Sequence, residues 1–165
     1  MGNLHLILLE KDHAREILTW RYPPPYNFYN PPEVQVAEDY VLEFINPAYQ
    51  FHAILDDNSR FIGFCSFGID GQVPGGDYSL EALDIGLGMT PELTGYGLGD
   101  QFLNAILSHA VIHYNPAVIR MTVANFNKRA LHLYEKSGFT RQQEFEDDML
   151  KITYTILVKQ AGKSI

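Results

Sequence analysis

The sequence predicts an α/β (α+β) fold, with a mixed sheet of about seven strands and roughly four main helices. Three observations lead to this prediction. Short runs of β-forming residues alternate with segments whose apolar residues recur at helical spacing. Glycine, proline and asparagine separate these segments. From Leu83 to Val123 a strand, a helix and a second strand follow one another, so the two strands should lie parallel with a right-handed crossover. Because 165 residues fit a domain of ordinary size, we expect residues 1–165 to form a single domain.

The first part of the chain should form three strands and two helices. The helices are bounded by prolines, which suit a first helical turn and end a helix that reaches them. The two strands of the hairpin are rich in β-forming residues and flank a turn segment. The predicted elements are a strand at 4–10, a helix at about 12–20, a helix from Pro32 or Glu33 to about Ile45, and a hairpin within 51–69 with its turn at Asp56–Ser59.

The remaining elements follow the same logic. Apolar residues of one helical face recur from Phe102 to Val111, and the pair Asn115-Pro116 ends that helix. Gly138 closes the next helix, as glycine often does. The predicted elements are a strand at Leu80–Met89, a helix from the glycine turn to about Tyr114, a strand at Val118–Val123, a helix at Asn127–Lys136, and strands at Thr140–Phe145 and about Met149–Val158.

Composition and charge exclude several classes of partner. The formal net charge of −8 argues against nucleic acid, whose binding proteins usually carry a basic face, although mild acidity for solubility alone also accounts for it. No stretch approaches the roughly twenty apolar residues of a membrane span, and the N-terminus lacks a basic export signal. The single cysteine, Cys65, cannot form an internal disulfide. We therefore expect a cytoplasmic protein that binds neither nucleic acid nor membrane.

The segment "TPELTGYGLGDQFLNAIL", residues 90–107, places three alternating glycines between a strand and a helix. It lacks the Gly-Lys-Ser/Thr ending of a Walker A loop, and Asp100 stands where a dinucleotide fingerprint needs its third glycine. A short glycine loop at the positive end of a helix can still bind an anion such as a pyrophosphate through its backbone N–H groups. The alternative is that the glycines only make a tight turn.

A second motif favours the anion-binding loop. "NFNKRALHLYEKSGF", residues 125–139, has Asn127 at a helix start, then Ala130 and Tyr134, and Gly138-Phe139 at the exit. With the segment Thr94 to Gly99, it resembles the paired signature of the GNAT superfamily of acetyl-CoA-dependent N-acetyltransferases. The resemblance is strongest over residues 79–140 and implies a three-layer fold whose mixed sheet splays at its centre. Thr94 departs from the family pattern, which usually has Arg or Gln there.

The resemblance implies a site for acetyl-CoA, with CoA as product. Pyrophosphate would lie on the N–H groups of residues 95–100, and pantetheine would pair with the strand backbone around Gly88. Glycines in that strand could instead relieve crowding, and Asn127 could be an N-cap as well as a cofactor ligand. The implied cofactor-binding residues are Leu87, Gly88, Met89, Thr94, Gly95, Tyr96, Gly97, Leu98, Gly99, Asp100 and Asn127.

Acetyl transfer to an amine needs two proton transfers. Tyr134 suits the protonation of the departing thiolate, because the ordinary pKa of a phenol is about 10, close to that of a thiol. Glu81 is the candidate base, with Asp84 in reserve and a water chain as a further route. Either carboxylate could be a hydrated surface charge instead. No metal site is expected, because His109 and His113 lack the glutamate of a His-Glu-x-x-His pattern.

The acceptor is expected to be a primary amine of a small molecule or peptide. In the family the acceptor lies near the loop between the first two helices, here Trp20 to Pro32, whose aromatic side chains could hold a cation or could form a local hydrophobic cluster. A catalytically silent CoA-binding sensor is the alternative function, and the retained Tyr134 argues against it. Assembly into a homodimer is left open.

Overall fold

The computed structural model describes residues 2–31 and 37–161. The chain divides into two compact units, each built from two stretches of sequence. The first combines Met1–Ser66 with Leu87–Ile106, and the second combines Phe67–Gly86 with Leu107–Ile165. Each unit is described by itself below. That residues 1–165 form a single domain stays a prediction.

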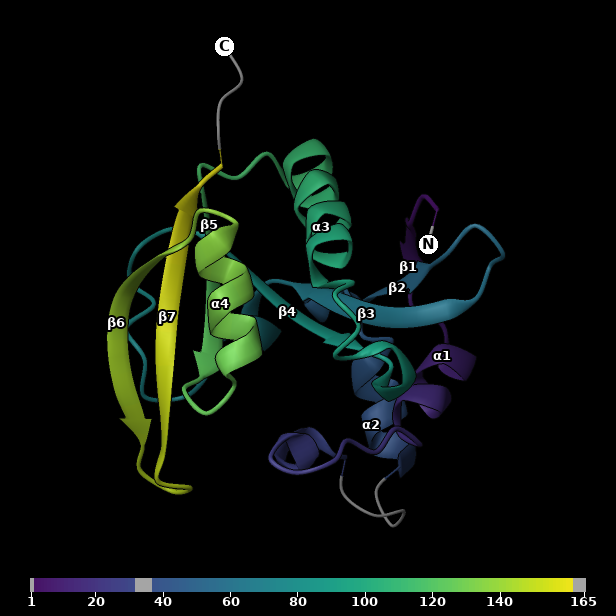
Figure 1. Ribbon diagram of the computed structural model, residues 1–165, viewed down its shortest axis with the longest axis horizontal. Helices are drawn as coiled ribbons and strands as arrows, with labels where there is room; N and C mark the ends of the chain where they lie inside the picture. The colour runs from purple at the N-terminus through teal and green to yellow at the C-terminus, as the bar shows by residue number, and fades with distance from the viewer. Residues whose placement is uncertain (1, 32–36, 162–165) are drawn as a thin grey trace. The chain divides into compact units, whose positions relative to one another are not determined.

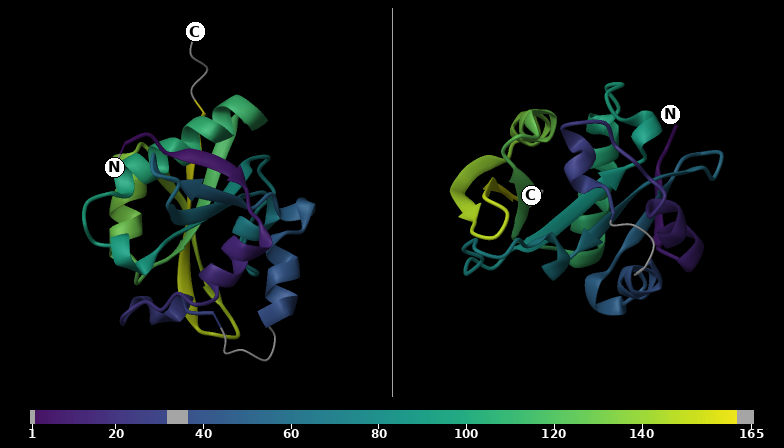
Figure 2. Two further views of the ribbon diagram at one scale, coloured as in Figure 1. Left: turned by 90° about the vertical axis from the view of Figure 1, so that its right-hand side faces the viewer. Right: turned by 90° about the horizontal axis from the view of Figure 1, so that it is seen from below.

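The first unit contains an antiparallel sheet. The strand β1 (His5–Leu8) pairs with β2 (His52–Leu55), beside which it lies in Figure 2, and β2 pairs with β3 (Phe61–Phe67). The turn between β2 and β3 is fixed by Asp56, whose carboxylate accepts hydrogen bonds from the amides of Asn58 and Arg60. The predicted first strand and the hairpin are therefore confirmed.

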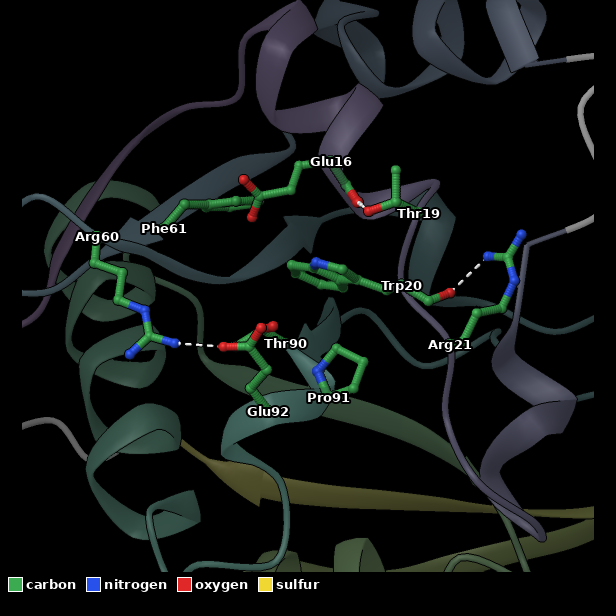
Figure 3. Close-up of a pocket in the computed structure, with 9 residues that line it drawn as sticks. All are labelled: Glu16, Thr19, Trp20, Arg21, Arg60, Phe61, Thr90, Pro91 and Glu92. Atoms are coloured by element: carbon green, nitrogen blue, oxygen red, sulfur yellow. Dashed lines mark hydrogen bonds and ion pairs between the residues drawn. The ribbon is translucent and has the colours of Figure 1, made fainter.

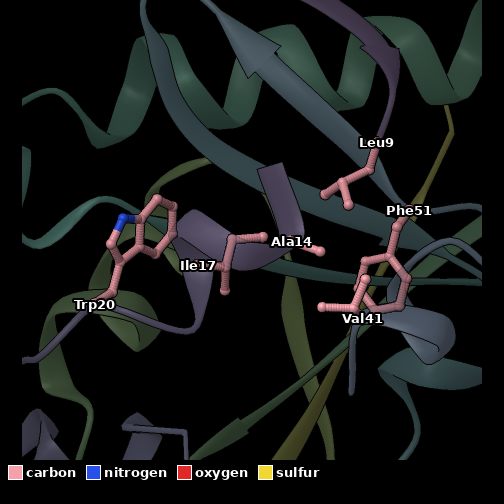
Figure 4. Close-up of a cluster of buried hydrophobic side chains, with 6 residues drawn as sticks. All are labelled: Leu9, Ala14, Ile17, Trp20, Val41 and Phe51. Carbon is pink, nitrogen blue, oxygen red and sulfur yellow. The ribbon is translucent and has the colours of Figure 1, made fainter. Parts of the chain in front are cut away.

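Two helices complete the core of this unit. The helix α1 (Lys11–Ile17) and the helix α2 (Ala37–Phe44) contribute to a buried cluster that Figure 4 shows. Two short 3₁₀ turns, η1 (Tyr26–Tyr29) and η3 (Pro47–Tyr49), lie in the connections. The buried members of the cluster are Leu9, Ala14, Ile17, Trp20, Val41 and Phe51.

The first helix is shorter than the sequence predicted. It ends at Ile17 instead of Trp20, because the amides of Thr19 and Trp20 bond to the carbonyls of Glu16 and Ile17 in a tighter turn. The predicted beginning of the second helix, at Pro32 or Glu33, lies outside the described residues.

The second unit is built on one parallel and two antiparallel strand pairs. The strand β4 (Leu83–Met89) starts in this unit and pairs in parallel with β5 (Val118–Ala124) through Leu83↔Ile119 and Asp84↔Arg120. The strand β7 (Ile152–Gln160) pairs antiparallel with β5 and with β6 (Thr140–Asp147). The predicted parallel unit is confirmed.

Helices join these strands. The helix α3 (Gly99–Tyr114) connects β4 to β5, and α4 (Lys128–Lys136) connects β5 to β6. Figures 1 and 2 show α4 beside β5. In the part of the chain that the structure describes, the strands follow the order β1-β2-β3-β4-β5-β7-β6, so the predicted mixed sheet of seven strands with four helices is confirmed. None of the described helices is both long and apolar enough to span a bilayer.

Two strands begin later than the sequence predicted. The strand β4 begins at Leu83 instead of Leu80, so Glu81 precedes it. The strand β7 begins at Ile152 instead of Met149, because the amides of Met149 and Leu150 bond to the carboxylate of Asp147 in a turn.

Candidate active site

The glycine loop precedes α3 in the first unit. A 3₁₀ turn, η5 (Pro91–Leu93), leads into it, and the hydroxyl of Thr94 donates to the carbonyl of Pro91 at 3.0 Å. Gly95 and Gly97 have φ angles of 82° and 76°, a conformation that other residues adopt only with strain. A Cβ added to Gly97 would meet no atom within 4 Å. Glycine is therefore needed there for the backbone conformation and not for packing.

The glycine loop presents backbone N–H groups that have no hydrogen-bond acceptor among the described residues. Among the described residues, the backbone amides of residues 95–99 donate no hydrogen bond. Gly95, Tyr96 and Gly97 are exposed, and the loop ends where α3 begins at Gly99. Successive free N–H groups at the positive end of a helix form a cradle for an anion. The arrangement fits the pyrophosphate of acetyl-CoA, which the sequence predicted at this loop.

The end of β4 contacts two aromatic residues of the first unit. A Cβ on Gly88 would lie 2.5 Å from the ring of Phe64 on β3, so this glycine is required by packing. The hydroxyl of Tyr22 donates to the carbonyl of Met89 at 2.6 Å, and burial raises the pKa of Tyr22 to about 12. The crowding alternative therefore explains Gly88, while Leu87 and Met89 are half-buried.

The second unit carries the predicted acid. Tyr134 lies on α4 with 5% of its surface exposed, and its carbonyl accepts from the amide of Phe139. At the start of this helix, the side-chain oxygen of Asn127 accepts from the amide of Ala130 at 3.1 Å. Asn127 is thus an N-cap, a role that the sequence predicted as compatible with a contact to the cofactor.

A buried ion pair occupies the beginning of β4 and β5. The guanidinium of Arg120 donates to both carboxylate oxygens of Asp84, at 2.6 and 2.7 Å, and to the carbonyl of Leu80 at 2.7 Å. Gln72 also donates to Asp84 at 2.9 Å. Tyr78 covers the guanidinium, with its ring centroid 4.8 Å from Arg120 Cζ. Hydrogen bonds to Asp84 raise the pKa of Arg120 above its usual value.

Sequence reasoning missed this network. Asp84 and Arg120 stand 36 residues apart and become neighbours only through the parallel register. The signal available in the sequence was an acidic residue, Asp84, in one predicted strand and a positively charged residue, Arg120, in the next. The ion pair with Arg120 gives Asp84 a structural role that competes with its use as a catalytic base. Glu81 is exposed and directly follows Leu80, whose carbonyl accepts a hydrogen bond from Arg120.

The side chains of the aromatic loop differ in burial. Trp20 belongs to the buried cluster and stacks on Phe61, with ring centroids 5.5 Å apart. Phe28 and Tyr29 are exposed and pack edge to face at 5.2 Å. The alternative of a local hydrophobic cluster is thus realised at Trp20.

The histidine pair lies on α3 in the second unit. The ring centroids of His109 and His113 are 4.1 Å apart, and His109 also stacks on Phe67. Within residues 2–31 and 37–161 no group of three or more His, Cys, Asp or Glu side chains could hold a metal ion.

Comparisons with known proteins identify the family and the fold. The model of the acetyltransferase (GNAT) family matches residues 12–139. No curated protein matches the chain. Among solved structures, a chimera of the spermidine N-acetyltransferase SpeG from Vibrio cholerae and hSSAT superposes with a TM-score of 0.76 at 21% identity, over 97% of this chain and 96% of that chain.

A second solved structure, spermidine N-acetyltransferase from Vibrio cholerae in complex with CoA and spermine, gives a TM-score of 0.75 at 20% identity, over 96% of each chain. At these identities the superpositions establish a shared fold.

Proposed function

Because the chain belongs to the acetyltransferase (GNAT) family, we propose that it transfers the acetyl group of acetyl-CoA directly to a primary amine of a small molecule or peptide, in a ternary complex. The observation that carries the proposal is the run of amides at residues 95–99, which lack acceptors among the described residues at the start of α3. An acetyltransferase needs such donors for the diphosphate of its acetyl donor.

Acetyl-CoA supplies the acetyl group as a thioester. The amides of the glycine loop hold its pyrophosphate, and the backbone of Leu87–Met89 is the proposed partner of pantetheine. The family match supports these placements, as does the positive φ of Gly95 and Gly97. The hydroxyl of Thr94 donates a hydrogen bond within the turn, at a position where the family pattern usually has Arg or Gln.

Two residues of the second unit are proposed to move protons. The acceptor nitrogen must lose a proton before it attacks the thioester carbonyl, and the sulfur must gain one as the carbon–sulfur bond breaks. We assign the first proton to Glu81, reached directly or through water, and the second to the hydroxyl of Tyr134. The ion pair with Arg120 makes Asp84 the weaker candidate for a base.

Small cationic amines are the favoured acceptors. Structural neighbours are named as spermidine N-acetyltransferases, and the net charge of −8 attracts cations. The deciding experiment incubates the protein with acetyl-CoA and a panel of amines, and follows free thiol. The panel holds spermidine, spermine, an aminoglycoside, lysine and a short peptide with a free N-terminus.

We expect thiol release above hydrolysis with at least one polyamine, and mass spectrometry should find one added acetyl group on the amine. Tight CoA binding without thiol release for any amine would support the alternative of a CoA-binding sensor and contradict the proposal. Thiol release with the peptide alone would support an acetyltransferase but contradict polyamines as its acceptors.

A further inference from the structure

A hydrogen bond joins the loop after α1 to the end of β4. The hydroxyl of Tyr22 donates to the carbonyl of Met89 at 2.6 Å, across 67 residues of sequence. Trp20 and Thr90, which are close to the two partners in the chain, line one pocket of about 510 Å³ (Figure 3). All of these residues belong to the first unit. The bond therefore lies within one compact part of the molecule.

The bond helps to fix the peptide group between Met89 and Thr90. The N–H of the same peptide group, which belongs to Thr90, donates to the carbonyl of Ile62 on β3 at 2.8 Å. Because a trans peptide group is planar, with its oxygen and its N–H on opposite sides, two such bonds leave it little freedom to turn.

This peptide group is the joint between two parts of the proposed acetyl-CoA site. The strand backbone of Leu87–Met89, the proposed partner of pantetheine, lies before it. After it, the η5 turn leads into the glycine loop, the proposed cradle of the pyrophosphate. The direction in which the chain leaves β4 therefore sets where the amides of the glycine loop lie relative to the strand.

Tyr22 is itself held by packing and by a second hydrogen bond. Its ring is half-buried against the cluster that contains Trp20, and its backbone amide donates to the side-chain oxygen of Asn30 at 2.7 Å. That bond closes residues 22–30 into a loop that contains the η1 turn. Burial raises the pKa of Tyr22 to about 12, so the hydroxyl keeps its proton at neutral pH and remains a donor.

We propose that Tyr22 is a positioning residue of the acetyl-CoA site, whose hydroxyl links the loop of residues 22–30 to the strand that receives pantetheine. This role rests on the proposed function, because it requires CoA to bind at β4 and the glycine loop. Through the bond to Met89, the loop holds the end of β4 ready for CoA, and bound CoA in turn steadies the loop. The two effects are one coupling free energy, which acts equally in both directions.

The test removes only the hydroxyl. Tyr22→Phe keeps the ring in the cluster, and Tyr49→Phe is the matched control. Tyr49 is half-buried against the same cluster, and its hydroxyl forms no hydrogen bond within residues 2–31 and 37–161. In calorimetric titrations of the full chain, Tyr22→Phe should bind CoA about two- to tenfold more weakly, because CoA must then order the end of β4 as it binds. Tyr49→Phe should keep the affinity of the wild type.

Limited proteolysis with chymotrypsin measures the coupling at the loop. Phe28 and Tyr29 are exposed and lie in the loop, and cuts after them are identified by mass spectrometry. Cuts after Leu150, which is exposed in the second unit, report any general effect of CoA on stability. Relative to those cuts, saturating CoA should slow the loop cuts in the wild type and in Tyr49→Phe, and not in Tyr22→Phe. A purely structural role would speed the loop cuts by the same factor with and without CoA.

Equal CoA affinity in Tyr22→Phe and Tyr49→Phe, or equal protection of the loop by CoA in both, would overturn the positioning role and leave the proposed function intact. A wild-type protein that does not bind CoA would contradict the proposed function itself, and the role of Tyr22 would fall with it. The two failures are therefore distinguishable.

Discussion

At the scale of single residues, the glycine loop makes the sharpest prediction. Gly97 and Gly68 both have positive φ, and neither has an atom within 4 Å of an added Cβ. Alanine at either position should therefore cost roughly 1–3 kcal/mol of folding stability through backbone strain. Only Gly97→Ala should also weaken the binding of CoA, because its methyl group would enter the proposed anion-binding cradle. Calorimetric titration with CoA measures this, with Gly68→Ala as the matched control.

An equal loss of CoA affinity in Gly97→Ala and Gly68→Ala would mean that general destabilisation causes the loss. Unchanged CoA affinity in Gly97→Ala would mean that the pyrophosphate does not bind at this loop.

Tyr134 makes the second prediction at this scale. Tyr134→Phe keeps the ring that packs near Phe139, with centroids 6.1 Å apart, and removes only the hydroxyl. If that hydroxyl protonates the thiolate, turnover should fall about 10²- to 10⁴-fold while acetyl-CoA affinity stays nearly constant. Steady-state kinetics with the best amine of the panel, together with CoA titration, separate the two quantities. A variant with normal turnover would leave protonation of the sulfur to water.

At the scale of elements, the ion pair of Asp84 with Arg120 joins β4, β5 and the connection that precedes β4. Removing one partner leaves the other as a buried charge, so Asp84→Leu should lower the free energy of unfolding by about 3–5 kcal/mol. The double change Asp84→Leu with Arg120→Met should cost less than the sum of the two single changes. Urea unfolding of the four proteins measures this coupling. Additive losses would mean that the pair contributes no specific interaction.

Elements also show how far local sequence determines structure. The hairpin, α3 and α4 were predicted closely, since turn residues, helical spacing and the cap at Asn127 act over a few neighbours. Element ends were less predictable. Glu81 falls outside β4, where Arg120 of β5 holds the carbonyl of Leu80. The helix α1 ends at Ile17, where the amides of Thr19 and Trp20 form a tighter turn that the apolar pattern does not show.

At the scale of the whole molecule, the family match spans residues 12–139 and therefore draws on both units. The predicted acetyl-CoA residues lie mainly in the first unit, and both proposed proton-transfer residues lie in the second.

The sequence by itself determined the order of the elements, the parallel pair and the glycine loop, and its paired motifs identified the family. Each of these follows from interactions between residues close in the chain or from a fixed spacing.

Only the tertiary structure decided which distant side chains meet. It placed Phe64 over Gly88, Arg120 against Asp84, and Trp20 beside Thr90 in one pocket. These contacts depend on strand register and on the packing of helices against strands. A one-residue slip of a strand turns every side chain to the other face, so composition and local pattern leave such pairs undetermined.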